Sequence, residues 1–204
     1  MSPENTREQI LDGFADQLLE SGYRGVSLKT ITEAIGIQRP SLYHHFPEGK
    51  EQIYAEVALR MIETDAARVH EALSASGELT VRLKSLALLH TDDSRKVALD
   101  QRIYDATRYV SDETRTVVST RYVDGLLAPV NAMMADAVAA GELRDLEPEF
   151  LTSTFFGMAQ VVQGIPEDVA MPPDKRGGPR AIASDIAAEV VELFLSGAAP
   201  ANPS

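Results

Sequence analysis

The amino-acid sequence predicts an all-α protein. Apolar residues recur every three or four positions along most of the 204 residues, which is the period of an amphipathic helix. Gly, Pro and capping residues punctuate these stretches, and the chain shows neither a β-hairpin pattern nor an internal repeat. Because 44% of the residues are hydrophobic, a chain of this length can bury a core without disulfides or metals to hold it.

The first helix is expected to begin near Thr6 and to end at Gly22. Thr6 and Gln9 have the spacing of a capping box, in which each side chain accepts a hydrogen bond from the other residue's exposed amide. The residues that follow are apolar at helical spacing. Gly22 is a natural end point because glycine tolerates the left-handed backbone that closes many helices.

Two short helices follow, joined by a tight turn. The second helix starts after Ser27, and its Ala34 is expected at a close crossing of the two helices, where a small side chain is required. Gly36 permits the turn between them. The third helix covers residues 38 to about 46 and has Pro40 in its first turn, where the missing backbone donor costs nothing.

Longer helices are expected in the rest of the chain, at about 50–73, 78–90, 93–109, 112–140, 148–165 and 179–197. Residues 114–123 are rich in β-branched side chains, which favour a strand locally. The apolar stripe at a spacing of four nevertheless continues through them, and this favours a helix. Pro129 is expected to kink that helix. Residues 166–179 hold four Pro and read as a loop, and residues 199–204 as a disordered tail.

The net charge of −12 conceals a local reversal of sign. Residues 1–50 hold five basic and seven acidic groups, whereas the rest of the chain holds fourteen and twenty-four. Within residues 24–50 four basic side chains oppose two acidic ones; they are Arg24, Lys29, Arg39 and Lys50 against Glu33 and Glu48. The chain therefore carries a small basic segment on an acidic remainder.

The composition argues against several classes of site. With zero Cys, the chain has no disulfide, thiolate nucleophile, Cys-ligated zinc or iron–sulfur cluster. Motifs typical of hydrolases, nucleotide-binding enzymes, zinc proteases and di-iron bundles are absent, so we expect no enzyme and no cofactor. His44 and His45 diverge on a helix and lack a carboxylate at metal-site spacing, so we expect no metal. Without a signal peptide or a long apolar run, the protein is expected to be cytoplasmic, with no membrane partner.

The two short helices have the layout of a helix-turn-helix, whose second helix can enter the major groove of DNA. Leu42 and Phe46, four residues apart, are expected to anchor that helix to the core. The polar side chains left on its other side can bond to phosphates or base edges; they are Gln38, Arg39, Ser41, Tyr43, His44 and His45. Lys50 opens the next helix, where its ammonium and the helix N-terminus together suit a phosphate. Lys29 and Thr30 complete the expected DNA contacts.

Residues 27–53 read SLKTITEAIGIQRPSLYHHFPEGKEQI, and this stretch resembles the DNA-binding domain of TetR-family transcriptional regulators. The resemblance covers roughly residues 4–64. Its most specific part is the Leu-Tyr-His-His-Phe segment at 42–46, followed by a Lys four positions later across a connector one residue longer than in many members. Carried over from the family pattern, Tyr43 and Lys50 become phosphate contacts. The candidate base readers are then Gln38, Arg39, Ser41 and His44.

The resemblance also implies an architecture and a function. Residues 4–64 would form the DNA-binding domain, and residues 65–198 a helical bundle that binds an effector and forms a homodimer. The function implied is that of a ligand-responsive regulator, most often a repressor, that binds a palindromic operator in double-stranded DNA. The alternative is a helical interaction or small-molecule-binding protein without specific DNA binding; the basic segment argues against it.

Two further sets of residues are expected in the C-terminal part. Polar groups embedded in apolar stripes suggest an effector pocket, although Met and aromatic residues at this spacing are also ordinary core. The pocket set is His90, Tyr104, Arg108, Tyr122, Leu126, Met133, Phe155 and Met158. The last two helices are apolar on two faces, and the surplus face is expected to meet a second copy. The dimer set is Gly157, Val161, Gly164, Ile186, Val190 and Phe194.

Overall fold

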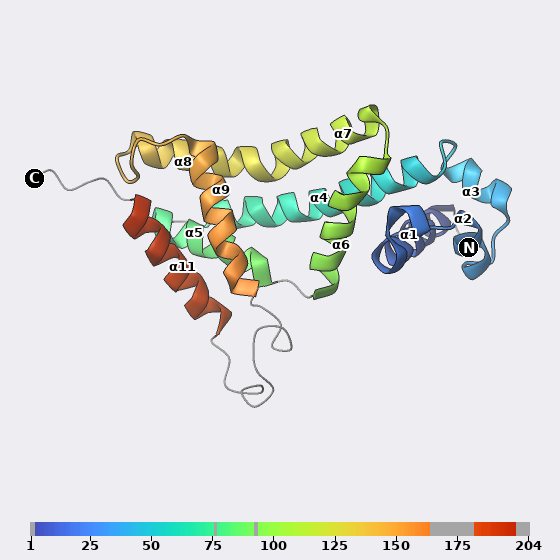
Figure 1. The fold of residues 1–204 in the computed structure, drawn as a ribbon, viewed down its shortest axis with the longest axis horizontal. Coiled ribbons are helices and arrows are strands. Elements are labelled where there is room, and N and C mark those ends of the chain that lie inside the picture. Colours follow the sequence, from blue (N-terminus) through green and yellow to red (C-terminus); the bar gives the residue numbers. More distant parts are fainter. Residues whose placement is uncertain (1–2, 76, 92–93, 164–181, 199–204) are drawn as a thin grey trace, which may run out of the picture. The chain divides into compact units, whose positions relative to one another are not determined.

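The computed structural model describes residues 3–75, 77–91, 94–163 and 182–198, and all regular elements within these ranges are helices (Figure 1). The expected all-α class is confirmed. The α-helices are α1 Pro3–Gly25, α2 Leu28–Ala34, α3 Arg39–His45, α4 Lys50–Ser74, α5 Leu79–Leu88, α6 Ser94–Ala106, α7 Asp112–Tyr122, α8 Ala128–Ala139, α9 Pro148–Ala159 and α11 Ala183–Ala198. Short helical turns connect them: η1 Leu89–Thr91, η2 Thr107–Tyr109, η3 Val123–Leu127 and η4 Gln160–Gln163. None of the helices described is both long and apolar enough to span a bilayer.

The chain divides into two compact units, which we call the head unit and the body unit. The head unit comprises Met1–Thr64 and Asp93–Val123, and the body unit comprises Asp65–Asp92 and Asp124–Ser204. The head unit therefore includes α6 and α7, which the sequence analysis groups with the C-terminal domain. The reason is that α6 packs along α1, where Arg102 Nε donates to the Leu19 carbonyl at 3.3 Å and Arg95 pairs with Asp16.

The start of α1 differs from the expectation. The helix already begins at Pro3, so Thr6 lies inside it as a buried residue, and the capping box with Gln9 is wrong. A proline is well suited to the first turn of a helix. Because the helix starts at Pro3, Thr6 is not at the position that caps it. The expected break at Gly22 is present, because Gly22 has φ of +66° and leaves the helical conformation there.

The helix-turn-helix forms as expected, with one exception. The Ser27 hydroxyl caps α2 by accepting the Thr30 amide at 3.3 Å, and Gly36, at φ +71°, makes the turn to α3. Ala34, however, is exposed rather than at a close crossing. The close approach lies instead between α1 and α2, where a Cβ on Gly13 would meet the Ile31 side chain at 3.3 Å.

The helix expected over 112–140 is present but interrupted. The side chain of Ser111 caps α7, which keeps its β-branched residues helical, and a π-helical turn, η3, separates α7 from α8. Pro129 is the second residue of α8, and the π-helical turn lies just ahead of it. Proline lacks a backbone donor and clashes with the carbonyl four residues earlier, which the wider π turn relieves.

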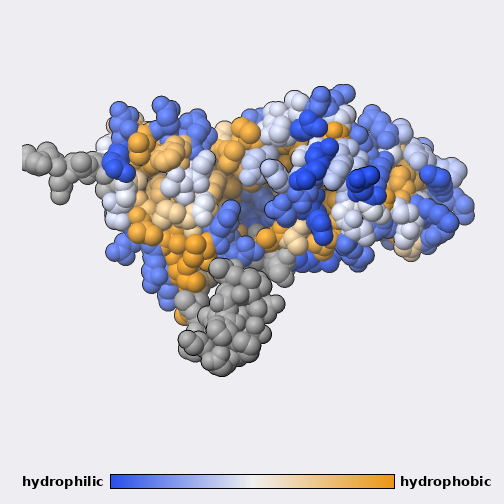
Figure 2. Space-filling view, viewed as in Figure 1, coloured by the Kyte–Doolittle hydropathy of each residue, from blue (hydrophilic) through white to orange (hydrophobic). Residues whose placement is uncertain are grey.

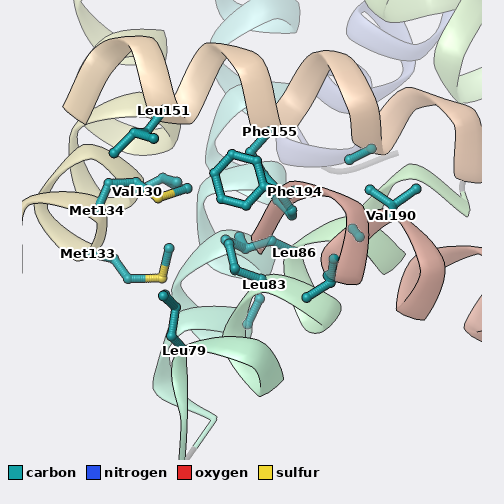
Figure 3. Close-up of a cluster of buried hydrophobic side chains, with 14 of the residues drawn as sticks. Leu79, Leu83, Leu86, Val130, Met133, Met134, Leu151, Phe155, Val190 and Phe194 are labelled. Carbon is teal, nitrogen blue, oxygen red and sulfur yellow. The ribbon is translucent and has the colours of Figure 1, made fainter. Parts of the chain in front are cut away.

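The body unit is built around one hydrophobic cluster of side chains from α4, α5, α8, α9 and α11 (Figure 3). Phe155 lies at its centre, and its ring meets that of Phe194 edge-on at 5.2 Å between centroids. Leu83, Leu86 and Met134 are fully buried around it. Apolar contacts of this kind have no preferred direction, and their strength depends on how completely the side chains fill the space between the helices. The expectations for residues 166–179, for Gly164 and for the tail at 199–204 lie outside the described residues.

Candidate nucleic-acid interface

Helix α3, which is expected to read DNA, presents polar side chains outward. Gln38, Arg39 and His44 are exposed and Ser41 is half-buried, whereas Leu42 and Phe46 have no exposed surface. The two buried side chains therefore fix the rotation of a helix that is only seven residues long. The structure thus brings the four expected base readers together on one short helix.

Tyr43 and Arg39 are held against each other beside the connector that follows α3. The Arg39 guanidinium carbon lies 5.9 Å from the Tyr43 ring centre, within the range of a cation–π contact. The ring edge rests on Gly49, where an added Cβ would come within 3.2 Å of Tyr43 Cε1. Gly49 also has φ of +71°, so any side chain there is strained as well as crowded. The Tyr43 hydroxyl is therefore presented on a ring with a defined position.

Two further expected contacts, Lys29 and Thr30, lie on α2. Lys29 is exposed and pairs loosely with Glu33, at 3.7 Å between Nζ and Oε1. A surface pair of this kind contributes little, so the ammonium is readily exchanged onto a phosphate. The Thr30 hydroxyl donates to the Ser27 hydroxyl at 3.1 Å and so takes part in the cap of α2.

Lys50 lies differently from the expectation. Its side chain turns inward, where Nζ donates to the Val26 carbonyl at 2.8 Å and lies 4.9 Å from the Tyr23 ring centre. This burial lowers the pKa of the Lys50 ammonium. Just ahead of α4, the Glu48 amide donates to Gln52 Oε1 at 3.2 Å. In this structure, Lys50 is bound within the head unit rather than presented beside the helix N-terminus.

Two residues of this region, Gln17 and Tyr23, are not among those expected from the sequence. Gln17 Oε1 accepts the Ser27 amide at 2.7 Å, and Tyr23 contacts both the Lys50 ammonium and the rings of Tyr54 and Tyr109. Nothing in the local pattern marks them, because a Gln on the polar side of an amphipathic helix and a Tyr at its end are common. Only contacts between distant segments give them a role.

The expected effector residues do not form one group. Tyr104, Arg108 and Tyr122 belong to the head unit, and the other five belong to the body unit. Tyr104 is 68% exposed, and Arg108 is an exposed partner of Asp105. In the body unit, Met133 and Phe155 are buried core and His90 meets Phe156 edge-on, while Leu126 and Met158 pack against the core. Most of the pocket set is therefore core or surface.

Two grooves open on the surface of the body unit, and neither is lined by the expected pocket residues. The larger one, of about 650 Å³, lies between α5 and α11 and is lined by Thr80, Lys84, Ala188, Val191, Glu192, Leu195 and Ser196. The smaller one, of about 440 Å³, is lined by Ala135, Val138, Ala139, Asp145, Leu146, Glu147 and Pro148. The described residues contain no cluster of three or more side chains suited to a metal ion.

The expected dimer set is divided by burial. Val190 and Phe194 are buried in the hydrophobic cluster of their own unit, and Ile186 is half-buried. Val161 is 60% exposed, and a Cβ on the exposed Gly157 would meet nothing within 4 Å. Among the described residues in and next to α9 and α11, Phe150, Ile182 and Leu193 are further exposed large apolar side chains. Figure 2 shows hydrophobic surface gathered over α9 and α11.

Known proteins resemble the chain in its N-terminal sequence and in its overall fold. Residues 10–57 match the family described as "Bacterial regulatory proteins, tetR family". Over 79 residues the chain is 35% identical to the HTH-type transcriptional repressor AcnR of Corynebacterium efficiens, and over 75 residues it is 35% identical to the HTH-type transcriptional regulator LmrA of Bacillus subtilis. These matches span 39% and 37% of this chain and 39% and 40% of the relatives.

Solved structures share the fold over nearly the whole chain. A regulatory protein in the tetR family from Rhodococcus RHA1 superposes with a TM-score of 0.73 and 16% identity, covering 99% of this chain and 100% of that one. AibR, solved in complex with isovaleryl coenzyme A and operator DNA, gives a TM-score of 0.64 and 22% identity, with 92% and 97% coverage. The N-terminal segment of the chain is thus similar to the tetR family of bacterial regulatory proteins, and the chain as a whole shares the all-α fold of these solved structures.

Proposed function

We propose that the protein is a sequence-specific DNA-binding transcriptional regulator that represses its target genes as a homodimer and responds to a small molecule. The observation that carries this proposal is the recognition helix α3. Its buried Leu42 and Phe46 set the rotation of the helix, and Gln38, Arg39 and His44 remain exposed. The names of the N-terminal relatives, a transcriptional repressor and a transcriptional regulator, support the same function.

Within this function the polar residues of the head unit have two roles. Gln38, Arg39 and His44 read base edges, where an Arg can bridge the two acceptors of a guanine. Tyr43 and Lys29 contact phosphates, which set position but carry no sequence information. Ser41 and Thr30 lie at the starts of α3 and α2 and serve either role through their hydroxyls.

The negative net charge of the chain makes the few phosphate contacts of the head unit important for binding. A net charge of −12 repels DNA at long range, so the basic segment has to supply the attraction locally. Weak non-specific binding follows, and operator binding depends on a few directional contacts. We therefore expect only the contacts to phosphates to contribute to the fall in operator affinity with rising salt concentration.

The dimer is formed by the exposed apolar surface of α9 and α11. Phe150, Gly157 and Val161 recur at helical spacing along α9 and η4, and Ile182, just before α11, and Leu193, on α11, add exposed apolar surface. An isologous contact between two such surfaces buries them together and places two copies of α3 around one two-fold axis. The half-sites are then expected about 34–36 Å apart, or at a small multiple of that spacing.

The effector binds in the body unit and changes the affinity for the operator. Three buried side-chain atoms there have no partner among the described residues: Arg82 Nε, Asn131 Oδ1 and Thr152 Oγ1. Buried polar atoms are normally paired, so a polar ligand that reaches them gains hydrogen bonds. The complex of the structurally similar AibR with isovaleryl coenzyme A and operator DNA supports an effector response. Such a ligand acts only if it prefers one conformation of the dimer.

The experiment that tests DNA reading starts with selection of bound sequences from a random DNA pool. Arg39→Ala should then relax the preference at one base pair in each half-site, at a cost of about 1–3 kcal/mol against the best sequence. Arg144→Ala, which removes the same charge from the body unit, is the control and should leave the selected sequence unchanged. An equal loss of affinity for every sequence in the Arg39 variant would show a phosphate contact instead.

The dimer is tested by placing the same charge at two exposed valines. Val161→Arg, on the proposed interface, should give a monomer in light scattering at micromolar concentration, because burying an unpaired guanidinium is costly. Val81→Arg, at a 45% exposed position on α5, should remain a dimer. A dimeric Val161→Arg protein would place the interface elsewhere.

A further inference from the structure

The side chain of Lys50 runs back from the start of α4 to the corner between α1 and α2. Its ammonium donates to the Val26 carbonyl at 2.8 Å and lies over the ring of Tyr23 at 4.9 Å from its centre. Val26 is buried, and Lys50 itself is half-buried. The charge is thus partly removed from solvent and held by a carbonyl dipole and an aromatic face, which is a specific environment for an ammonium.

The other side of the same peptide unit is held as well. The carbonyl of Val26 and the amide of Ser27 belong to one planar group, and the Ser27 amide donates to Gln17 Oε1 at 2.7 Å. Lys50 therefore fixes the oxygen of this peptide and Gln17 fixes its N–H. With both ends held, the plane of the peptide has one orientation.

That orientation decides how the chain enters α2. Ser27 is the cap of α2, and its hydroxyl accepts the Thr30 amide at 3.3 Å. The helix is only seven residues long and is too short to be stable by itself, so its direction depends on the residues that start it. Since α2 packs against α3, a tilt at Ser27 is passed to the recognition helix.

We propose that Lys50 is a positioning residue, which sets the direction of α2 and α3 by clamping the Val26–Ser27 peptide together with Gln17, and does not contact a DNA phosphate. This inference rests on the proposed DNA-binding function and deepens it. To reach a phosphate, the ammonium would have to leave both the carbonyl and the ring, and the buried carbonyl would lose this partner. Lys29, with a side chain 76% exposed, has no such cost and serves as the comparison.

Three variants separate the two roles in a salt series of operator affinities. Lys50→Met keeps the aliphatic stem and removes the ammonium, Gln17→Leu removes the other half of the clamp without changing charge, and Lys29→Met is the control for a phosphate contact. We expect Lys50→Met and Gln17→Leu to weaken operator binding by about two- to tenfold at every salt concentration, with the salt slope of the wild type. Lys29→Met should make that slope shallower by about 0.9 for each phosphate that the variant no longer neutralises.

Two results would overturn the proposal. One is a salt slope for Lys50→Met that becomes shallower as in Lys29→Met, which would show a phosphate contact. The other is wild-type affinity in Gln17→Leu or Lys50→Met, which would show that the clamp does not position the helices. If Lys50→Met fails to fold, Gln17→Leu carries the comparison, since it tests the same peptide unit.

Amine labelling tests the placement of Lys50 without DNA. In the free wild-type protein, an acetylating reagent should modify Lys29 much faster than Lys50, and operator DNA should protect Lys29 while leaving the rate at Lys50 unchanged. Equal rates at the two lysines in the free protein, or protection of Lys50 by DNA, would contradict the proposal. If the wild type binds no selected sequence, the proposed function fails, but the labelling of the free protein still reports on the clamp.

Discussion

The two compact units are stabilised by different kinds of contact. In the head unit, side chains from distant segments meet through hydrogen bonds and ring contacts, of which the bond from the Tyr54 hydroxyl to the Ile103 carbonyl at 2.9 Å is the most deeply buried. In the body unit, a single cluster of aliphatic, Met and Phe side chains fills the space between helices. Directional contacts fix orientation, whereas apolar packing fixes volume. The unit expected to read DNA is the one in which orientation is fixed.

The head unit shows this along the edge where α6 leads into α7. The rings of Tyr23 and Tyr109 stack in parallel at 6.3 Å between centroids, and Tyr23 meets Tyr54 edge-on at 5.4 Å. Beside them, the Ser111 amide donates to Glu51 at 2.9 Å, and hydrogen bonds from Ser111 lower the pKa of the Glu51 carboxyl. Residues 94–123 therefore belong structurally to the head unit, although they lie far in sequence from its N-terminal helices.

The largest expected effect comes from opening the apolar core of the body unit. Phe155→Ala removes a fully buried ring and should lower the free energy of unfolding by about 3–5 kcal/mol. Amide exchange should show the loss in α9 and α11, and protection in α1 should stay closer to that of the wild type. Uniform loss of protection throughout the chain would mean that the two units unfold together. The units would then differ in their kinds of contact but not in their stability.

A smaller effect is expected from removing one directional contact in the head unit. Tyr54→Phe deletes the hydrogen bond to Ile103 and should cost about 0.5–1.5 kcal/mol at neutral pH. Chemical denaturation at pH 7 measures this cost. A cost as large as that of Phe155→Ala would contradict the expectation that single polar contacts in the head unit set orientation more than stability.

The same tyrosine gives the head unit an alkaline limit. Burial first, and the nearby Tyr23 second, raise the pKa of Tyr54 to about 12, above the value near 10 for a free tyrosine. Because the folded state favours the neutral phenol, this stabilisation is complete below pH 10 and is lost as the pH rises through about 12. The fall in stability over that range should be smaller in Tyr54→Phe than in the wild type.

The smallest effect is expected at an exposed residue of the pocket set. Tyr104→Ala changes a side chain that is 68% exposed on α6, and it should alter the free energy of unfolding by less than about 0.5 kcal/mol. It serves as the surface control for Phe155→Ala, since both remove an aromatic ring. Once an inducing molecule is identified, the operator response of this variant should equal that of the wild type, and an absent response would return Tyr104 to the effector site.

The sequence by itself was enough to determine those features that depend on neighbouring residues. The break at Gly22, the turn at Gly36, the proline in the first turn of α3 and the interrupted helix before Pro129 are local in origin, and so is the outward side of α3. Backbone sterics and helical periodicity act over a few residues, so the pattern of residue types is sufficient to predict them. The exposed Gln38, Arg39 and His44 follow from the buried Leu42 and Phe46 in the same way.

Only the tertiary structure decided which partner each side chain takes. Both sides of α11 are apolar, and packing against Phe155, rather than the pattern, chose Val190 and Phe194 as the inner side. Lys50 finds the Val26 carbonyl across 24 residues, and Tyr54 finds Ile103 across 49. A long flexible side chain such as that of Lys has many rotamers of similar energy, and the contact that selects one of them exists only after distant segments have packed together.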